Sequence, residues 1–321
     1  MATTPSPAPF VVQPALTALA IAYKNQAMIA DQILPRVQVD SPDFKYTVFT
    51  QADTFTIPDT RVGRTSAPNQ IDWSATEKTD SVQDHALDQP VPYRDVKAAQ
   101  AAQNIYGVMP VDPEARATEQ LSDLILLDRE KRTADLVFNA SSYASANVEV
   151  LSGTSQWSDF TNSNPINDIL AALDLMIVRA NTLALGQAVW TKLRQHPKVV
   201  QAIYGTAATS GVVTRDQVAA LLEIPNLVVG QGWLNSAKKG QTPTLTRLWG
   251  KHASLLYINP LAVSAKDLTF GITAQWGSRV AGSTPDSKIG MLGGTMVRVG
   301  EAVKELVVAD DVGYFFENAV A

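Results

Sequence analysis

The chain has 321 residues, of which 45% are hydrophobic and 18% charged, and its formal net charge is −5 at pH 7. This composition predicts a globular chain with one large or two moderate domains, and mild acidity without a basic run excludes the usual electrostatic footprint of a nucleic-acid-binding protein. The absence of cysteine excludes disulfides, thiolate catalysis and cysteine-ligated zinc.

We expect the N-terminal part to begin with a flexible arm. Residues 1–13 are rich in Pro, Ala, Thr and Ser and have no positively charged start, so they do not resemble a secretory signal. In residues 14–34 apolar side chains recur at helical spacing and charged residues interrupt any membrane-length span. We therefore expect an amphipathic helix that ends at Pro35 and needs a cover for its apolar face. That face includes Leu16, Leu19 and Tyr23.

After Pro35 the pattern becomes extended. Apolar and polar residues alternate in residues 44–57, as in half-buried strands, and an extended character resumes at residues 71–91 after a polar stretch. This predicts one long two-stranded excursion with a mobile tip. Because an isolated two-stranded ribbon is marginal in water, we expect it to lie on another subunit or, as an ordinary hairpin, on its own domain.

A long amphipathic helix is predicted over residues 112–139. Asp112 is a good N-cap, Pro113 suits the first helical position, and no residue inside the segment breaks a helix. Asp128 and Arg132 are four residues apart on the opposite, exposed side. Such a rod is either a buried helix of an ordinary α/β enzyme or a support onto which sheets and loops are attached. Its expected buried face comprises Ala117, Leu121, Leu124, Ile125, Ala134, Val137 and Phe138.

Residues 164–262 alternate helical patterns with short apolar runs, which predicts an α/β or α+β unit. Residues 187–190 fit a buried strand, and residues 227–229 fit another. Thr214 and Gln217 have the spacing of a helix-starting capping box.

Residues 268–321 are strand-like and favour a closing antiparallel pair, with the Gly- and Ser-rich residues 277–294 as the loop between its strands. No repeat at a fixed period is visible, so a solenoid is not expected.

The residues that usually carry chemistry do not form a recognisable site. His85, His196 and His252 have no second histidine at metal-ligand spacing, and the serines and glycines match neither a nucleophile elbow nor a phosphate-binding loop. Asp128 and Glu130 have basic neighbours, which favours ion pairing over general acid–base work. We expect no catalytic residue, no cofactor and no metal.

The order of these elements resembles the major capsid proteins of tailed bacteriophages with the Hong Kong 97-type fold. Each motif is moderately specific, and their order along nearly the whole chain carries the resemblance. The matching segments are ALTALAIAYKNQAMIADQILPRVQVD followed by FKYTVF, DHALDQPVPYRD, ATEQLSDLILLDREKRTADLVF, IPNLVVG, LWGKHASLLYI and VKELVVADDVGYFFEN.

The resemblance implies an α+β chain with a Hong Kong 97-like organisation. The implied parts are an N-terminal arm (1–38), an extended β-loop (39–95), a peripheral domain (96–163) with a spine helix (112–139), an axial domain (164–262) and return strands of the peripheral domain (263–321).

The implied function is self-assembly, as pentamers and hexamers, into an icosahedral shell around double-stranded DNA, which the inner wall contacts weakly and without sequence specificity. Only some 40 residues precede the first strand, which leaves no room for a fused scaffolding segment, so we expect a separate scaffolding protein. The resemblance also implies a portal and, optionally, a decoration protein as partners, and no membrane. The implied location is the virion capsid, with synthesis and assembly in the bacterial host cytoplasm. The alternatives are an encapsulin-like nanocompartment, an α/β enzyme, and a decoration or tail-tube subunit.

Several side chains are expected to contact neighbouring subunits. We expect the apolar ones to become buried only on assembly, and Arg61 or Arg64 at the loop tip to pair with a neighbour's carboxylates. No local pattern identifies a lysine–asparagine pair around Lys45 or Lys78, so covalent cross-linking is not expected. The expected contact residues are Leu16, Leu19, Tyr23, Phe44, Tyr46, Phe55, Arg61, Arg64 and Trp73.

Overall fold

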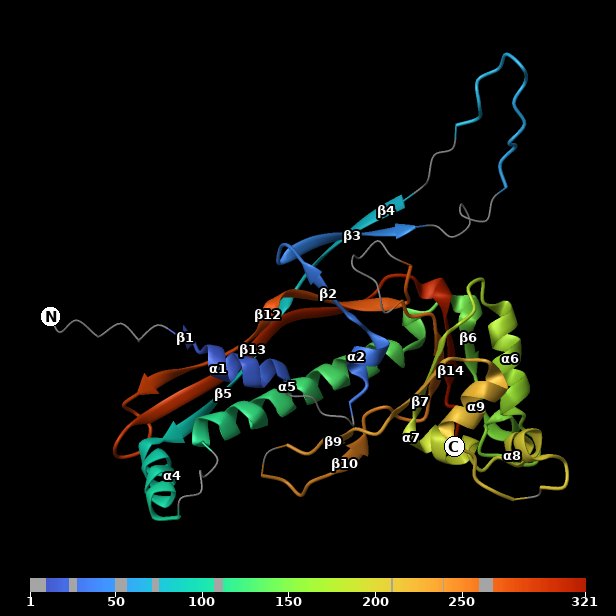
Figure 1. The fold of residues 1–321 in the computed structure, drawn as a ribbon. Helices are drawn as coiled ribbons and strands as arrows, with labels where there is room; N and C mark the ends of the chain where they lie inside the picture. The colour runs from blue at the N-terminus through green and yellow to red at the C-terminus, as the bar shows by residue number, and fades with distance from the viewer. Residues whose placement is uncertain are drawn as a thin grey trace.

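The computed structural model describes residues 10–22, 28–49, 57–70, 75–106, 112–208, 210–238, 240–259 and 268–321. The helices are α1 (Pro14–Ala22), α2 (Ala30–Ile33), α4 (Tyr93–Tyr106), α5 (Pro113–Val137), α6 (Pro165–Leu175), α7 (Gln187–Leu193), α8 (Pro197–Tyr204) and α9 (Arg215–Leu222). The strands are β1 (Val11–Val12), β2 (Arg36–Val39), β3 (Asp43–Phe49), β4 (Ala75–Ser81), β5 (Gln83–Pro92), β6 (Val148–Val150), β7 (Thr182–Gly186), β8 (Asn226–Gly230), β9 (Trp233–Asn235), β10 (Leu245–Arg247), β11 (Ala253–Leu256), β12 (Gly271–Asp286), β13 (Gly294–Val307) and β14 (Gly313–Glu317). This mixture confirms the predicted α+β class (Figure 1).

The long helix α5 forms as its sequence predicts. The Asp112 side chain accepts a hydrogen bond from the Glu114 amide, and Pro113 occupies the first turn. Its 25 residues make a rod about 38 Å long, which runs beneath the long strands β12 and β13 (Figure 1). One residue of the expected buried face is wrong, because Leu124 is 52% exposed.

The first sheet has the order β1-β12-β13-β5, and β2 also pairs with β12. Strands β12 and β13 are antiparallel, as predicted. The predicted loop over residues 277–294 is wrong in its first part, because β12 continues to Asp286. The pairing of β12 with β13 shifts register between Trp276 and Val280. Gly277 in this segment has a φ of 69°, a backbone conformation that glycine adopts more readily than other residues. The strand pattern is therefore interrupted by a bulge and not ended.

The two faces of this sheet carry different elements. Val297 and Val299 of β13 pack against α1 and α5, whereas Leu306 packs on the other face with Phe44 and Tyr46 of β3. Because successive side chains of a strand point to opposite faces, odd-numbered residues of β13 face the helices and even-numbered ones face the excursion. The sheet is thus a middle layer, with α1 and α5 on one face and the β3–β4 pair on the other.

The N-terminal segment is not the single helix that we predicted over residues 14–34. The described residues form α1 and the short α2, and Met28 and Ile29 between them are not helical. The reason is a tertiary contact, because the amides of Ile29 and Ala30 donate to the Glu130 carboxylate instead of to helical carbonyls. A side chain of α5 therefore ends the regular pattern of the arm.

The second sheet has the order β6-β14-β11-β7-β8 and carries the largest apolar core, together with α6 to α9. The predicted strand over residues 187–190 is wrong, since these residues begin α7 and the buried strand is β7, just before them. The capping box of Thr214 and Gln217 and the strand at 227–229 are confirmed. Strands β6 and β14 come from outside residues 164–262.

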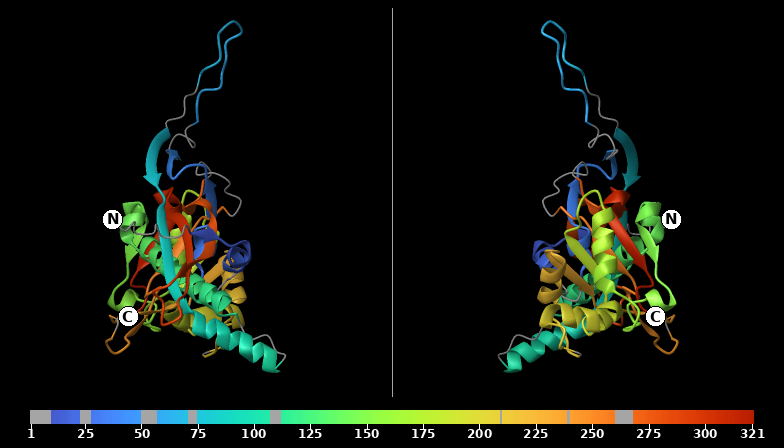
Figure 2. Two further views of the ribbon diagram at one scale, coloured as in Figure 1. Left: turned by 90° about the vertical axis from the view of Figure 1, so that its left-hand side faces the viewer. Right: turned by 90° about the vertical axis from the view of Figure 1, so that its right-hand side faces the viewer.

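Two further strand pairs stand apart from these sheets. Strands β3 and β4 form the paired part of the excursion, with Asp43 opposite Ser81, and β9 and β10 form a second, smaller hairpin. Figure 2 shows residues 57–70 projecting far from the rest of the chain. Among the helices in the described ranges, none is long and apolar enough to cross a membrane.

Candidate functional site

Glu130 of α5 is fully buried in the middle of the helix. Its carboxylate accepts hydrogen bonds from the Ile29 amide at 2.9 Å, the Ala30 amide at 2.8 Å and the Trp249 indole at 2.6 Å. Burial raises the pKa of Glu130, and the three donors oppose that rise. Because these donors come from the N-terminal segment and from the turn before β11, Glu130 fastens both to α5.

Arg129, the preceding residue, is buried as well, and burial lowers its pKa. Its guanidinium donates to the Asp31 carboxylate at 2.5 Å, to the Leu34 carbonyl at 3.2 Å and to the Thr273 hydroxyl at 3.0 Å. Burial would raise the pKa of Asp31, but Arg129 and Arg36 outweigh it and leave that pKa lowered. Arg129 therefore connects α2 with strand β12.

A second buried carboxylate, that of Glu301 in β13, binds Arg36 and Arg279. It accepts from Arg36 at 3.0 Å and from Arg279 at 3.0 Å, and Arg279 also donates to the Ala20 carbonyl at 2.8 Å. Burial opposes ionisation of Glu301, but the two arginines prevail and its pKa is lowered. We call these groups the charged junction. Its members are Asp31, Arg36, Arg129, Glu130, Arg279 and Glu301.

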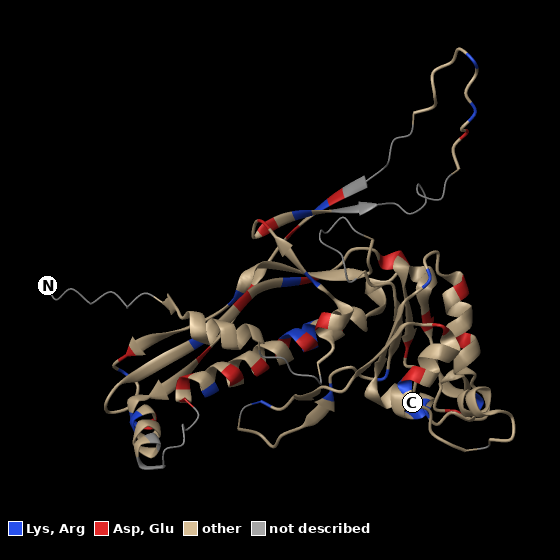
Figure 3. Cartoon of the chain, viewed as in Figure 1, with Lys and Arg blue, Asp and Glu red and all other residues tan. Residues whose placement is uncertain are grey.

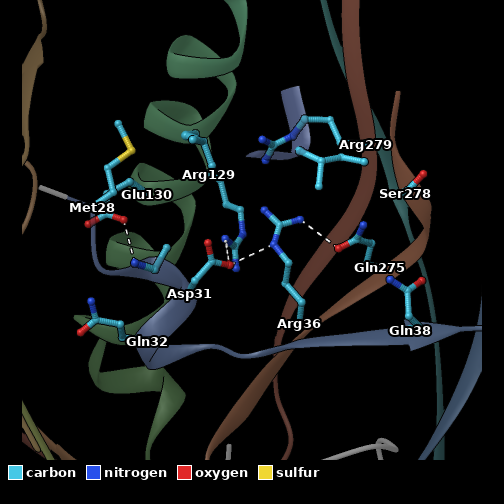
Figure 4. Close-up of a pocket in the computed structure, with 13 residues that line it drawn as sticks. Met28, Asp31, Gln32, Arg36, Gln38, Arg129, Glu130, Gln275, Ser278 and Arg279 are labelled. Carbon is cyan, nitrogen blue, oxygen red and sulfur yellow. Dashed lines mark hydrogen bonds and ion pairs between the residues drawn. The ribbon is translucent and has the colours of Figure 1, made fainter. Parts of the chain in front are cut away.

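The charged junction borders a cavity of about 680 Å³. Figure 4 shows Arg36, Arg129 and Arg279 converging on it from β2, α5 and β12. Each guanidinium already has a carboxylate partner within the chain. In the described part of the chain, no group of three or more histidines or acids could hold a metal ion. The arrangement is suited to joining chain segments.

Sequence reasoning missed the charged junction, although a signal was present. Arg129 and Glu130 follow Ile125 and Leu126 by four residues each, so they continue the buried stripe of α5. The expectation of ion pairing is confirmed for Asp128, which pairs with Arg132. For Glu130 the expectation of ion pairing is wrong, because its carboxylate accepts its hydrogen bonds from two amides and an indole.

Three apolar residues of the predicted contact set are already buried in the single chain. Leu16 is 7% exposed, and Phe44 and Tyr46 are each 8% exposed, so the expectation that they become buried only on assembly is wrong. They are covered because α1 and β3 pack on the two faces of the first sheet. Leu19 is half-buried. Three more expected contacts lie outside the described residues, namely Tyr23, Phe55 and Trp73.

Arg61 and Arg64 are exposed in residues 57–70, the projecting part of the excursion (Figures 1 and 3). The Arg61 amide donates to the Asp59 side chain at 3.0 Å, which shapes the backbone locally. Neither guanidinium forms an ion pair with a residue in the described ranges. The two cations are therefore presented to solvent.

Comparison with known proteins decides which class of protein carries this arrangement. No family model matches the chain. A major capsid protein of Pseudomonas phage JBD67 is 51% identical over 316 residues, which are 98% of this chain and 99% of that protein. The chain belongs to the phage major capsid proteins. It builds a virion shell from copies of itself, it is not an enzyme, and the phage relative favours a coat over the nanocompartment alternative.

Solved structures support the same fold for this capsid protein. A phage-related protein from Bordetella bronchiseptica RB50 superposes with a TM-score of 0.75 at 21% identity, over 97% of this chain and 99% of that one. The capsid of the cyanophage P-SCSP1u gives a TM-score of 0.56 at 11% identity, over 92% and 89%. The fold described above is therefore shared with these two proteins.

Proposed function

We propose that this capsid protein builds its shell in the Hong Kong 97-like manner. In this proposal residues 1–38 are the arm, 39–95 the extended loop, 96–163 and 263–321 the peripheral domain with α5 as its spine, and 164–262 the axial domain. The copies assemble as pentamers and hexamers, and the extended loop of each lies across a neighbouring copy.

One observation carries the proposal, namely that residues 57–70 project from the body with Arg61 and Arg64 exposed (Figure 2). A projection of this length buries no apolar core of its own, and a ribbon is marginal unless another surface supports it. The strand pair at its base is anchored through Phe44 and Tyr46. The chain thus holds the base firmly and offers the projection to a neighbour.

The other partners are proposed from the same assembly. A separate scaffolding protein sets the shell size, a portal occupies one vertex, and a decoration protein is an optional addition. The double-stranded DNA touches the inner wall weakly, which fits a net charge of −5. Assembly takes place in the host cytoplasm.

The experiment replaces residues 57–70 by a Gly/Ser segment of the same length in the full chain. We expect an unchanged melting profile, because these residues are exposed and contribute little to the subunit's core. We also expect closed shells to be lost when the variant is produced with the phage's other structural proteins, by sedimentation and negative-stain electron microscopy. Normal shells from this variant, beside wild-type shells made in parallel, would contradict the proposal.

A further inference from the structure

The hairpin β9–β10 lies in an unusual stretch of sequence. Residues 224–265 contain no acidic residue, although the whole chain carries a net charge of −5. The same stretch contains Lys238, Lys239, Arg247 and Lys251. Its hairpin is a two-stranded sheet of its own and is not continued by either large sheet. The stretch is distinguished by the absence of acidic residues, so Lys238 and Arg247 have no nearby acid in the sequence, and they belong to a ribbon that has little support of its own.

The hairpin also exposes apolar surface beside these charges. Trp233 is 49% exposed and Leu245 is 63% exposed. The Arg247 guanidinium lies over the Trp233 ring, 4.1 Å from its centroid. Lys238, Arg247 and Lys251 are exposed, and no ion pair in the described part of the chain involves them. Exposed tryptophan beside arginine is the composition that protein–protein interfaces favour.

A complementary surface exists at the base of the excursion. Asp40, Asp43 and Asp84 are exposed there, and none takes part in an ion pair with a residue that the structure describes. They are close in the fold, since Asp43 lies opposite Ser81 in the β3–β4 register and β5 follows β4 directly. Across residues 40–46 and 75–84, five acidic residues stand against two lysines. We call this surface the acidic base.

The hairpin and the acidic base lie on opposite sides of the subunit. Figure 1 shows β3–β4 above the first sheet and β9–β10 below α5, and the turned views of Figure 2 keep this separation. The two surfaces cannot meet within one chain. Two complementary patches on opposite sides of a subunit meet in a head-to-tail contact, which repeats from copy to copy and closes into a ring when the rotation permits.

We propose that the β9–β10 hairpin of one copy docks on the acidic base of the next copy in the shell. Lys238 and Arg247 face the carboxylates of Asp40, Asp43 and Asp84, and Trp233 and Leu245 become buried in the contact. This inference rests on shell assembly by the chain and adds to it a specific pair of surfaces.

DNA is the weaker candidate for this surface. A duplex offers phosphates to the cations, but it offers no apolar surface that would cover Leu245, and its stacked bases are closed to Trp233. A protein surface satisfies the cations and the apolar side chains together. The experiments below separate these two partners.

The first experiment uses the absence of cysteine in the chain. Ser81→Cys and Thr246→Cys are combined, because both positions are exposed and neither change removes a charge of the proposed contact. Intact particles of the double variant are treated with a short bismaleimide. We expect a ladder of covalent multimers on a denaturing gel, and none with either single variant. Intact particles of the double variant that give no ladder would overturn the inference.

The second experiment reverses charges across the contact. Arg247→Glu alone and Asp43→Lys alone should each reduce the yield of closed particles roughly tenfold, because every copy in the shell repeats the contact. The two changes together should restore much of the yield. Circular-dichroism melts check that each variant folds, and Lys288→Glu in the β12–β13 turn is the control for a charge change elsewhere.

The outcomes are distinguishable. Particles that form at the wild-type yield but retain less DNA would show that the hairpin contacts DNA, and would overturn the inference. Normal yields for both single reversals, with normal DNA content, would overturn it as well. Failure of the wild-type chain to form any shell with the phage's other structural proteins would instead contradict the proposed function.

Discussion

The charged junction and the excursion both contain many charged residues but use them in opposite ways. In the junction Arg129, Glu130 and Glu301 are buried and hydrogen-bonded within the chain. In the excursion Arg61 and Arg64 are exposed, and its Lys45–Glu77 ion pair lies in solvent. A buried charge without a partner costs several kcal/mol, whereas an exposed pair contributes little. Removing one partner within the junction is therefore expected to destabilise the subunit, whereas the excursion leaves its charges available to neighbours.

The largest effect is expected for Glu130→Ala. The change leaves the Ile29 and Ala30 amides and the Trp249 indole without their acceptor in a buried site. We expect the free energy of unfolding to fall by about 3–5 kcal/mol. Urea unfolding followed by tryptophan fluorescence measures it. Glu119→Ala on the same helix is the control and should change stability by less than about 0.5 kcal/mol. Equal effects of the two changes would contradict the expectation that loss of the buried Glu130 acceptor destabilises the subunit.

The next effect is expected for Phe44→Ala at the start of the excursion. Phe44 packs with Val37, Ile272 and Leu306, so its removal leaves a cavity between β3 and the first sheet. We expect a loss of about 3 kcal/mol, confined to the opening of β3 and β4. Amide hydrogen exchange in these strands measures it. Lys45→Ala, on the exposed side of the same strand, should leave exchange unchanged, and faster exchange there too would contradict the assigned faces.

A smaller effect, dependent on pH, is expected for Glu301→Gln. The pKa of Glu301 is lowered in the folded chain, since Arg36 and Arg279 outweigh its burial. An acid of this kind stabilises the fold above its unfolded pKa, about 4.3, and the stabilisation is lost as the pH falls through the lower, folded-state value. At pH 7 we expect the variant to be less stable by about 2 kcal/mol.

The difference between wild type and Glu301→Gln should therefore shrink below about pH 4, as the wild-type carboxylate becomes protonated. Thermal melts at a series of pH values measure the difference. Glu77→Gln, an exposed acid of the excursion, should give a difference near zero throughout. A difference for Glu301→Gln that stays constant down to pH 3 would mean that its charge does not stabilise the junction.

The smallest effect on the subunit is expected for Arg61→Ala combined with Arg64→Ala. Both side chains are exposed and form no ion pair in the part of the chain that the structure describes, so stability should change by less than about 0.5 kcal/mol. Shell assembly should nevertheless be weakened if these cations pair with a neighbour's carboxylates. Sedimentation of shells at increasing salt compares the variant with wild type. Normal shells at every salt concentration would remove these arginines from the contact.

Much of the fold could be predicted because local signals agreed with the tertiary structure. Asp112 and Pro113 start α5, and Thr214 with Gln217 starts α9, since these residues satisfy backbone amides that any helix start leaves free. The predictions failed where a neighbour in space decided the outcome. Met28 and Ile29 leave the helical pattern because a carboxylate of α5 takes up the amides of Ile29 and Ala30.

The candidate surfaces were predicted less well than the fold. Alternation along β3 marked Phe44 and Tyr46 as one buried face but could not say whether their own sheet or another subunit covers them. The positive hairpin was missed because its basic residues are scattered, and only the absence of acidic residues from 224–265 distinguishes them. A contact between copies depends on which side of the body each patch occupies, and one chain's residue order does not contain that information.

The sequence by itself determined elements such as α5, α9 and β8, because helix caps, strand alternation and turn residues act over a few neighbours in the chain. The tertiary structure alone decided which partners Arg129 and Glu130 have, that Leu124 is exposed, and that the acidic base and the β9–β10 hairpin lie on opposite sides. Burial and pairing of charge depend on groups far apart in the sequence. Asp31 and Arg129 meet only because α2, α5 and β12 pack together, and no local pattern specifies that packing.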